Sequence, residues 1–144
     1  MKVIAIILTL LSPAVTPATD ESVRFTTVDI RIDPAGKALA AYQVEFVAAD
    51  VSRVKLVGIE GGDAAAFTQP PYYDPSALSQ NRVIVAAFNT GRSLPSAPFR
   101  AARLHVQITG SETPKWEAKL VVAAGADGKT VPGAAVSLSE GAAK

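Results

Sequence analysis

Apolar and polar side chains alternate with a period of two along most of the chain after Asp20, which is typical of half-buried strands. Between residues 25 and 33, for example, Val28, Ile30 and Ile32 would share one face, and polar residues would occupy the other. Residues 54–59 are apolar on both faces, which predicts a strand that is covered on both sides. The expected strands cover residues 25–33, 42–48, 54–59, 82–88, 102–109, 116–123 and 131–138.

Turn-forming residues separate these segments. Residues 33–36 (Asp-Pro-Ala-Gly) and 126–129 (Ala-Asp-Gly-Lys) are the clearest cases. We therefore expect about seven to nine short strands and no long amphipathic helix. Strands with one apolar and one polar face pack as two stacked sheets, so the pattern predicts an all-β protein, an antiparallel β-sandwich.

The first 18 residues have the pattern of a secretory signal peptide. Lys2 precedes a short apolar run over residues 3–11, and small residues follow up to Ala18. The run is too short to cross a bilayer, which takes about 20 apolar residues. We expect cleavage after Ala18, with Ala14 as an alternative, and a secreted or periplasmic domain spanning residues 19–144.

The amino-acid composition excludes several classes of function. The chain has 144 residues, 14 Lys+Arg, 13 Asp+Glu and no Cys, so the formal net charge is +1. That length supports one folded domain. A nucleic-acid binder would need clustered basic residues, so we expect no nucleic-acid partner. The absence of cysteine excludes a disulfide framework, a thiol nucleophile and cysteine-based zinc sites.

Two long, proline-stiffened loops carry the candidate ligand-binding residues. Residues 64–80 include Tyr72 and Tyr73, and residues 89–100 include Arg92 and Phe99. Exposed aromatic rings stack on sugars or anchor protein partners. The alternative is structural, with one tyrosine closing the end of the sandwich and the other merely exposed. Trp116 begins a strand on its apolar face and is expected to pack in the core.

Catalytic and metal chemistry has little support in the residues. His105, the single histidine, falls on the polar face of a strand, so an exposed structural position is expected. A carboxylate pair drawn from Glu60, Asp63 and Asp74 could serve glycoside hydrolysis, but such loop acids usually form turns. Calcium on Asp63, Asp74 or Asp127 has only a weak basis, because the spacing of a calcium loop is missing. We expect neither an enzyme nor a bound metal.

The order of segments resembles the cohesin-like family. The resemblance consists of an aromatic core strand, an apolar strand ending in a glycine-containing turn, a long strand ending in glycine, and an Asp-Gly turn before the last strand. It rests on residues 42–46, 54–60, 82–91, 102–110 and 126–132, and spans about residues 23–138.

This resemblance implies a jelly-roll-like sandwich and a non-catalytic binding role. The implied partner is a dockerin-like protein module or a polysaccharide, held in cohesins on a sheet face. No binding motif of the family transfers residue by residue. The alternative is a carbohydrate-binding module that uses the loop tyrosines.

Overall fold

The computed structural model describes residues 21–50 and 52–141, and the predicted signal peptide lies outside this part of the chain. Two short 3₁₀ helices, η1 (Ala65–Phe67) and η2 (Pro75–Ala77), interrupt the segment between the third and fourth strands. The strands are β1 (Val23–Asp33), β2 (Ala41–Ala48), β3 (Val54–Glu60), β4 (Arg82–Phe88), β5 (Phe99–Thr109), β6 (Trp116–Ala124) and β7 (Ala135–Glu140).

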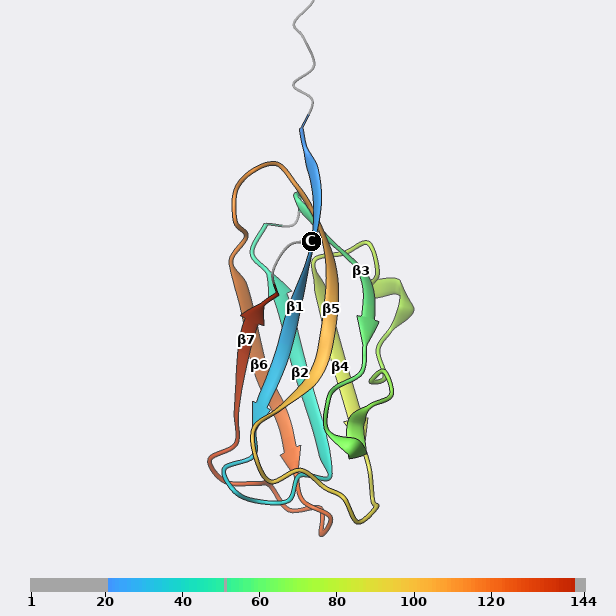
Figure 1. The fold of residues 1–144 in the computed structure, drawn as a ribbon, viewed down its shortest axis with the longest axis vertical. Coiled ribbons are helices and arrows are strands. Elements are labelled where there is room, and N and C mark those ends of the chain that lie inside the picture. Colours follow the sequence, from blue (N-terminus) through green and yellow to red (C-terminus); the bar gives the residue numbers. More distant parts are fainter. Residues whose placement is uncertain (1–20, 51, 142–144) are drawn as a thin grey trace, which may run out of the picture.

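The strands form two stacked antiparallel sheets. One sheet has the order β3-β5-β1-β7 and the other has the order β4-β2-β6. Figure 1 looks onto the four-stranded sheet, with the three-stranded sheet behind it. The expected all-β sandwich is thereby confirmed. Across the described residues, no helix has the length and apolarity that a membrane crossing demands.

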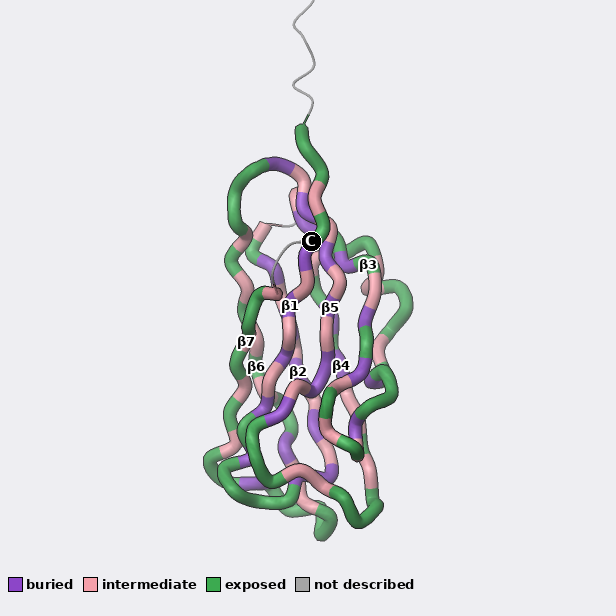
Figure 2. The backbone as a smooth tube through the Cα atoms, viewed as in Figure 1, coloured by how far each residue is buried: buried purple, intermediate pink, exposed green. Residues whose placement is uncertain are grey.

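The core lies between the sheets, where alternate residues of the long strands are buried (Figure 2). Phe46 and Leu104 are completely buried. Trp116, expected in the core, is half-buried and packs against it, stacking on Phe46 with 5.9 Å between ring centroids. The buried Tyr42 hydroxyl donates to the carbonyl of Ala101 at 3.0 Å, and burial raises the pKa of this phenol. The alternation that predicted the strands therefore also identifies the core.

Two bulges change which side chains face outward. Val57 is an extra residue in β3 opposite β5, so Leu56 and Ile59 both point inward while Val57 is 43% exposed. The expectation that this strand is covered on both sides is wrong. In β6, Val121 is the extra residue opposite β2, and it turns Val122 outward instead of into the core.

The predicted last strand, residues 131–138, is two separate pieces. Thr130 forms a bridge with Ala124 of β6, and the Val131 amide donates to the carbonyl of Ala123 at 2.8 Å. The chain then turns at Gly133, whose φ of 77° suits glycine, and enters the other sheet as β7. The chain crosses between the sheets here, so a single strand over 131–138 was the wrong expectation.

The long segment between β3 and β4 is anchored in the core through Phe67. This ring is 3% exposed and lies edge-on to Tyr42, with centroids 5.2 Å apart. Gly61 makes the close approach possible, because a Cβ there would lie 2.0 Å from the carbonyl oxygen of Thr68. The loop is therefore held against the sandwich close to the edge of β4.

Candidate functional site

The outer face of the three-stranded sheet carries a cluster of exposed apolar side chains. On β4, Val83 and Val85 fill the core, while Ile84 and Phe88 point outward and are 37% and 68% exposed. We call the cluster the apolar patch. Its members are Tyr72, Ile84, Phe88, Val121 and Val122.

Tyr72 joins the patch through its backbone. Its amide donates to the carbonyl of Ala86 at 2.7 Å, and the Ala86 amide donates back at 2.9 Å. Residues paired in this way project from the same face, so the tyrosine ring stands beside β4 and is 71% exposed. It lies nearly parallel to the Phe88 ring, with centroids 6.3 Å apart. The loop thus fixes one exposed aromatic ring against another.

Small residues connect the two sides of the patch. Ala41 of β2 lies between Phe88 and Ala124 in the register, and Gln43 lies between Ala86 and Val122. Gln43 is therefore the one long polar side chain in these two rows. The result is a low apolar surface that spans three strands.

Charged residues border the patch in the row that also holds Ile84, where Glu45 of β2 lies opposite Ile84. Arg82 and Glu45 form an ion pair at 3.1 Å, and Lys119 lies opposite Glu45 on β6. These side chains are exposed or half-buried and remain accessible to solvent. A rim of this kind around an apolar centre is common in protein interfaces.

Of the four residues predicted to bind a ligand, Tyr72 and Tyr73 line one hollow of about 460 Å³ beside β4, and the other two do not join them. Tyr72 lies in the patch, whereas Tyr73 is half-buried and packs against the core. Phe99 is 4% exposed and stacks on Phe67 at 5.7 Å, which leaves its ring no free face for a ligand. Arg92 is exposed in the β4–β5 loop. The ring of Tyr72 is thus exposed, whereas the ring of Tyr73 helps close the sandwich.

The loop aspartates considered for calcium each stabilise backbone. Asp63 accepts from the Arg100 amide at 2.7 Å, Asp74 caps η2 by accepting from the Ser76 amide at 2.9 Å, and Asp127 accepts from the amide two residues on at 3.0 Å. The Asp74 hydrogen bonds lower the pKa of that carboxyl. Over residues 21–50 and 52–141, no three His, Cys, Asp or Glu side chains gather closely enough to hold a metal.

The outer face of the four-stranded sheet carries paired charges instead. Arg103 makes two hydrogen bonds to Asp29, at 2.7 and 2.9 Å, and these lower the pKa of the aspartate. Beside this pair, Nε2 of His105 lies 2.7 Å from Glu60 Oε1. His105 is therefore a half-exposed strand residue with a carboxylate neighbour, not an isolated one.

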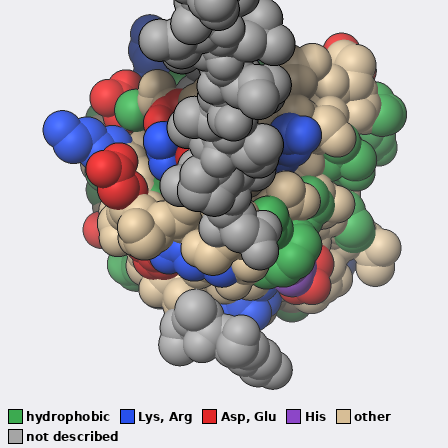
Figure 3. All heavy atoms as spheres, turned by 90° about the horizontal axis from the view of Figure 1, so that it is seen from above, with side chains coloured by type: hydrophobic (Ala, Val, Ile, Leu, Met, Phe, Trp, Pro, Cys, Tyr) green, Lys and Arg blue, Asp and Glu red, His purple; other side chains and the backbone are tan. Residues whose placement is uncertain are grey.

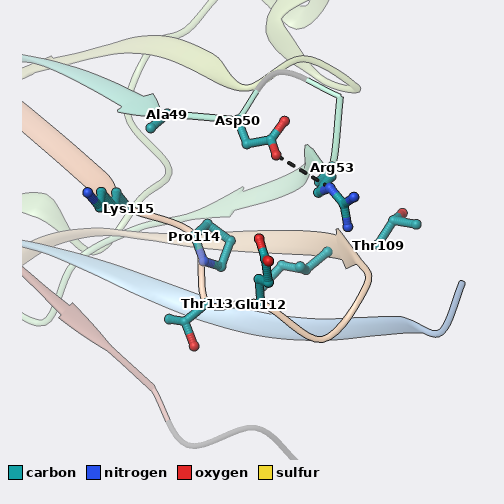
Figure 4. A pocket seen from close by; sticks show the side chains of 9 residues that line it. Ala49, Asp50, Arg53, Thr109, Glu112, Thr113, Pro114 and Lys115 are labelled. Atoms are coloured by element: carbon teal, nitrogen blue, oxygen red, sulfur yellow. Dashed lines mark ion pairs between the residues drawn. The ribbon is translucent and has the colours of Figure 1, made fainter.

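Acidic and basic side chains are interspersed at the end of the sandwich where β1 begins (Figure 3). A hollow of about 410 Å³ opens at this end (Figure 4). Asp50 and Arg53 form an ion pair beside it at 3.5 Å, and Glu112 and Lys115 also line it. The Asp50 and Arg53 side chains are 45% and 40% exposed, so they form a solvated pair, not a buried reactive group.

No family model matches the chain, and neither the curated proteins nor the solved structures contain a significant match. The site must therefore be interpreted from its own residues. Ile84 and Phe88 were not predicted as site residues, because the pattern over residues 82–88 predicts a strand without identifying which of its apolar side chains stay exposed. The useful indication was present, since an apolar run in a strand with one buried face leaves apolar side chains on the exposed face.

Proposed function

We propose that the protein is a secreted or periplasmic, non-catalytic binding module of the cohesin type, and that it holds a protein partner on the apolar patch. The observation that carries this proposal is the exposure of Tyr72 and Phe88, 71% and 68%, beside three exposed aliphatic residues on one sheet face. Contiguous apolar surface of this kind, when polar residues surround it, marks interaction sites.

The chemistry of the patch favours a protein over a polysaccharide. Ile84, Val121 and Val122 offer branched aliphatic side chains, which pack against apolar side chains but give a sugar neither a flat ring nor a hydrogen bond. The two aromatic rings supply large contact areas with few rotatable bonds, as is common at interface hot spots. A protein partner would bury both kinds of side chain together.

The backbone that holds the patch in place also favours recognition of a partner. Three of its members project from regular strands, and the bulge fixes Val121 next to Val122. The backbone of Tyr72 is tied to β4 by two hydrogen bonds. A preformed surface loses little conformational entropy when it binds, so a partner can dock without refolding the module.

The test is a pull-down from the native extracellular fraction with three variants beside the unaltered chain. Tyr72→Ala and Phe88→Ala truncate the patch, and Phe25→Ala is the matched control because this ring is 59% exposed on the other sheet. We expect one protein to be retained by the chain and by Phe25→Ala, and at least tenfold less by Phe88→Ala, since hot-spot truncation costs about 2 kcal/mol or more. Retention of no protein at any salt concentration, or equal retention by all variants, would contradict the proposal. Retention of polysaccharide that depends on Tyr72 would favour the carbohydrate-binding alternative.

A further inference from the structure

A second hollow lies over the four-stranded sheet, on the face of the molecule opposite the apolar patch. It has a volume of about 480 Å³, within the range of small-molecule sites. Phe25 and Thr27 of β1, Arg103 and His105 of β5, Glu60 of β3 and Gly141 after β7 line it. Three strands and the end of a fourth therefore contribute to one site.

A bulge in β3 sets the register beside this hollow. Gly58 lies opposite His105 in the register, directly after the bulge at Val57. The imidazole lies over this glycine, where a Cβ would be 3.8 Å from the ring, an ordinary van der Waals contact. Nε2 of the ring reaches Oε1 of Glu60 at 2.7 Å, and the ring lines the hollow together with Thr27.

On its other side the hollow is limited by Gly141. Its amide donates to the Thr27 carbonyl at 2.8 Å, and a Cβ at Gly141 would lie 2.1 Å from the Thr27 hydroxyl oxygen. The backbone thus packs directly against the threonine without covering it. The Thr27 hydroxyl is one of the polar groups that line the hollow.

Among the described residues, the only arginine that lines the hollow already has a carboxylate partner. Arg103 is held by two hydrogen bonds from its guanidinium to Asp29, and Nε2 of His105 lies 2.7 Å from Oε1 of Glu60. The lining therefore offers an anion no arginine that is free of a carboxylate. It does have further hydrogen-bonding capacity, since a carboxylate has about four acceptor positions and an arginine has five donors.

An exposed aromatic ring completes the arrangement. Phe25 is 59% exposed and stands on the same strand face as Thr27, one pleat away. An apolar ring face beside several hydrogen-bonding groups, with the one arginine already paired, matches a molecule that has both C–H faces and many hydroxyl groups. We propose that this hollow is a binding site for a neutral saccharide, separate from the apolar patch.

The probes are cellohexaose, xylohexaose, mannohexaose and chitohexaose, with a hexagalacturonate as the charged comparison. Each is titrated into the ¹⁵N-labelled chain, and amide chemical shifts are followed by NMR. We expect at least one neutral hexasaccharide to shift the amides of Thr27, Arg103 and His105. The anionic probe should bind more weakly, because Arg103 is already paired with a carboxylate.

Variants then separate this site from the patch. Phe25→Ala should weaken saccharide binding about tenfold, and Glu60→Gln should weaken it several-fold, whereas Phe88→Ala should change it less than twofold. Both Phe25 and Glu60 are more than half exposed, so these variants are expected to fold. The inference is overturned if no neutral probe shifts these amides at millimolar concentration, if only the uronate binds, or if the shifts map to Tyr72 and Phe88. Phe25 and Glu60 lie outside the apolar patch, so failure by either of the first two outcomes does not affect the proposed protein docking. Shifts at Tyr72 and Phe88 would instead favour the carbohydrate-binding alternative.

Discussion

Replacing Phe67 with alanine tests how the loop that carries Tyr72 is held. The Phe67 ring is 3% exposed and contacts the rings of Tyr42 and Phe99 at centroid distances of 5.2 and 5.7 Å. Truncation of a ring buried to this extent costs about 3–5 kcal/mol of unfolding free energy. Phe88 is 68% exposed, so only about a third of that burial is lost in Phe88→Ala, and we expect a cost of about 1 kcal/mol.

Urea unfolding followed by the fluorescence of Trp116, the single tryptophan, measures both variants. With a denaturant dependence of about 1–3 kcal/mol per molar, Phe67→Ala should lower the midpoint by more than 1 M at an unchanged slope. Phe88→Ala is the matched control and should shift it much less. A loss below about 1.5 kcal/mol for Phe67→Ala, or equal losses for the two variants, would refute the assignment of one ring to the core and the other to a binding surface.

Two further substitutions test the sheet face and the loop geometry. Asp29→Asn should cost about 1–2 kcal/mol at pH 7, because it removes the charged partner of Arg103. The pKa of Asp29 is lowered in the folded state, so its contribution to stability is present above the unfolded pKa of about 4 and is lost as the pH falls below that value. The melting temperatures of the unaltered protein and of Asp29→Asn should therefore converge in acid. A difference that stays constant with pH would contradict this. Gly61→Ala should destabilise the fold by about 1–3 kcal/mol, since its methyl group would overlap the Thr68 carbonyl. Gly58→Ala is the matched control in the same melting assay. Its methyl group would have its nearest contact at 3.8 Å, so it should cost less than about 1 kcal/mol. Equal melting temperatures for the two glycine variants would exclude the close approach at Gly61.

The sequence pattern predicted the sandwich because burial of one strand face imposes a period of two, as in residues 25–33 and 102–109. It could not predict the bulges at Val57 and Val121, because a bulge is defined by the register with a neighbouring strand. Each bulge reverses the inside–outside assignment of the residues that follow. That reversal places Val122 on the surface.

The candidate site was only partly predictable for a similar reason. Tyr72 was identified by its residue type and loop position, but its partner Phe88 depends on a bridge between the loop and β4. Phe99 looked like a loop aromatic, yet Phe67, 32 residues earlier, packs over it. Contacts between residues so far apart in the chain leave no local pattern.

Hydroxyl-radical footprinting of the protein with its captured partner tests the central claim most directly. Tyr72, Phe88 and Phe25 are all well exposed in the free protein and should be oxidised at comparable rates. The account predicts that the partner strongly protects Tyr72 and Phe88 and leaves Phe25 unchanged. Protection of Phe25 with continued oxidation of Tyr72 and Phe88 would place the partner on the four-stranded sheet and contradict docking on the apolar patch.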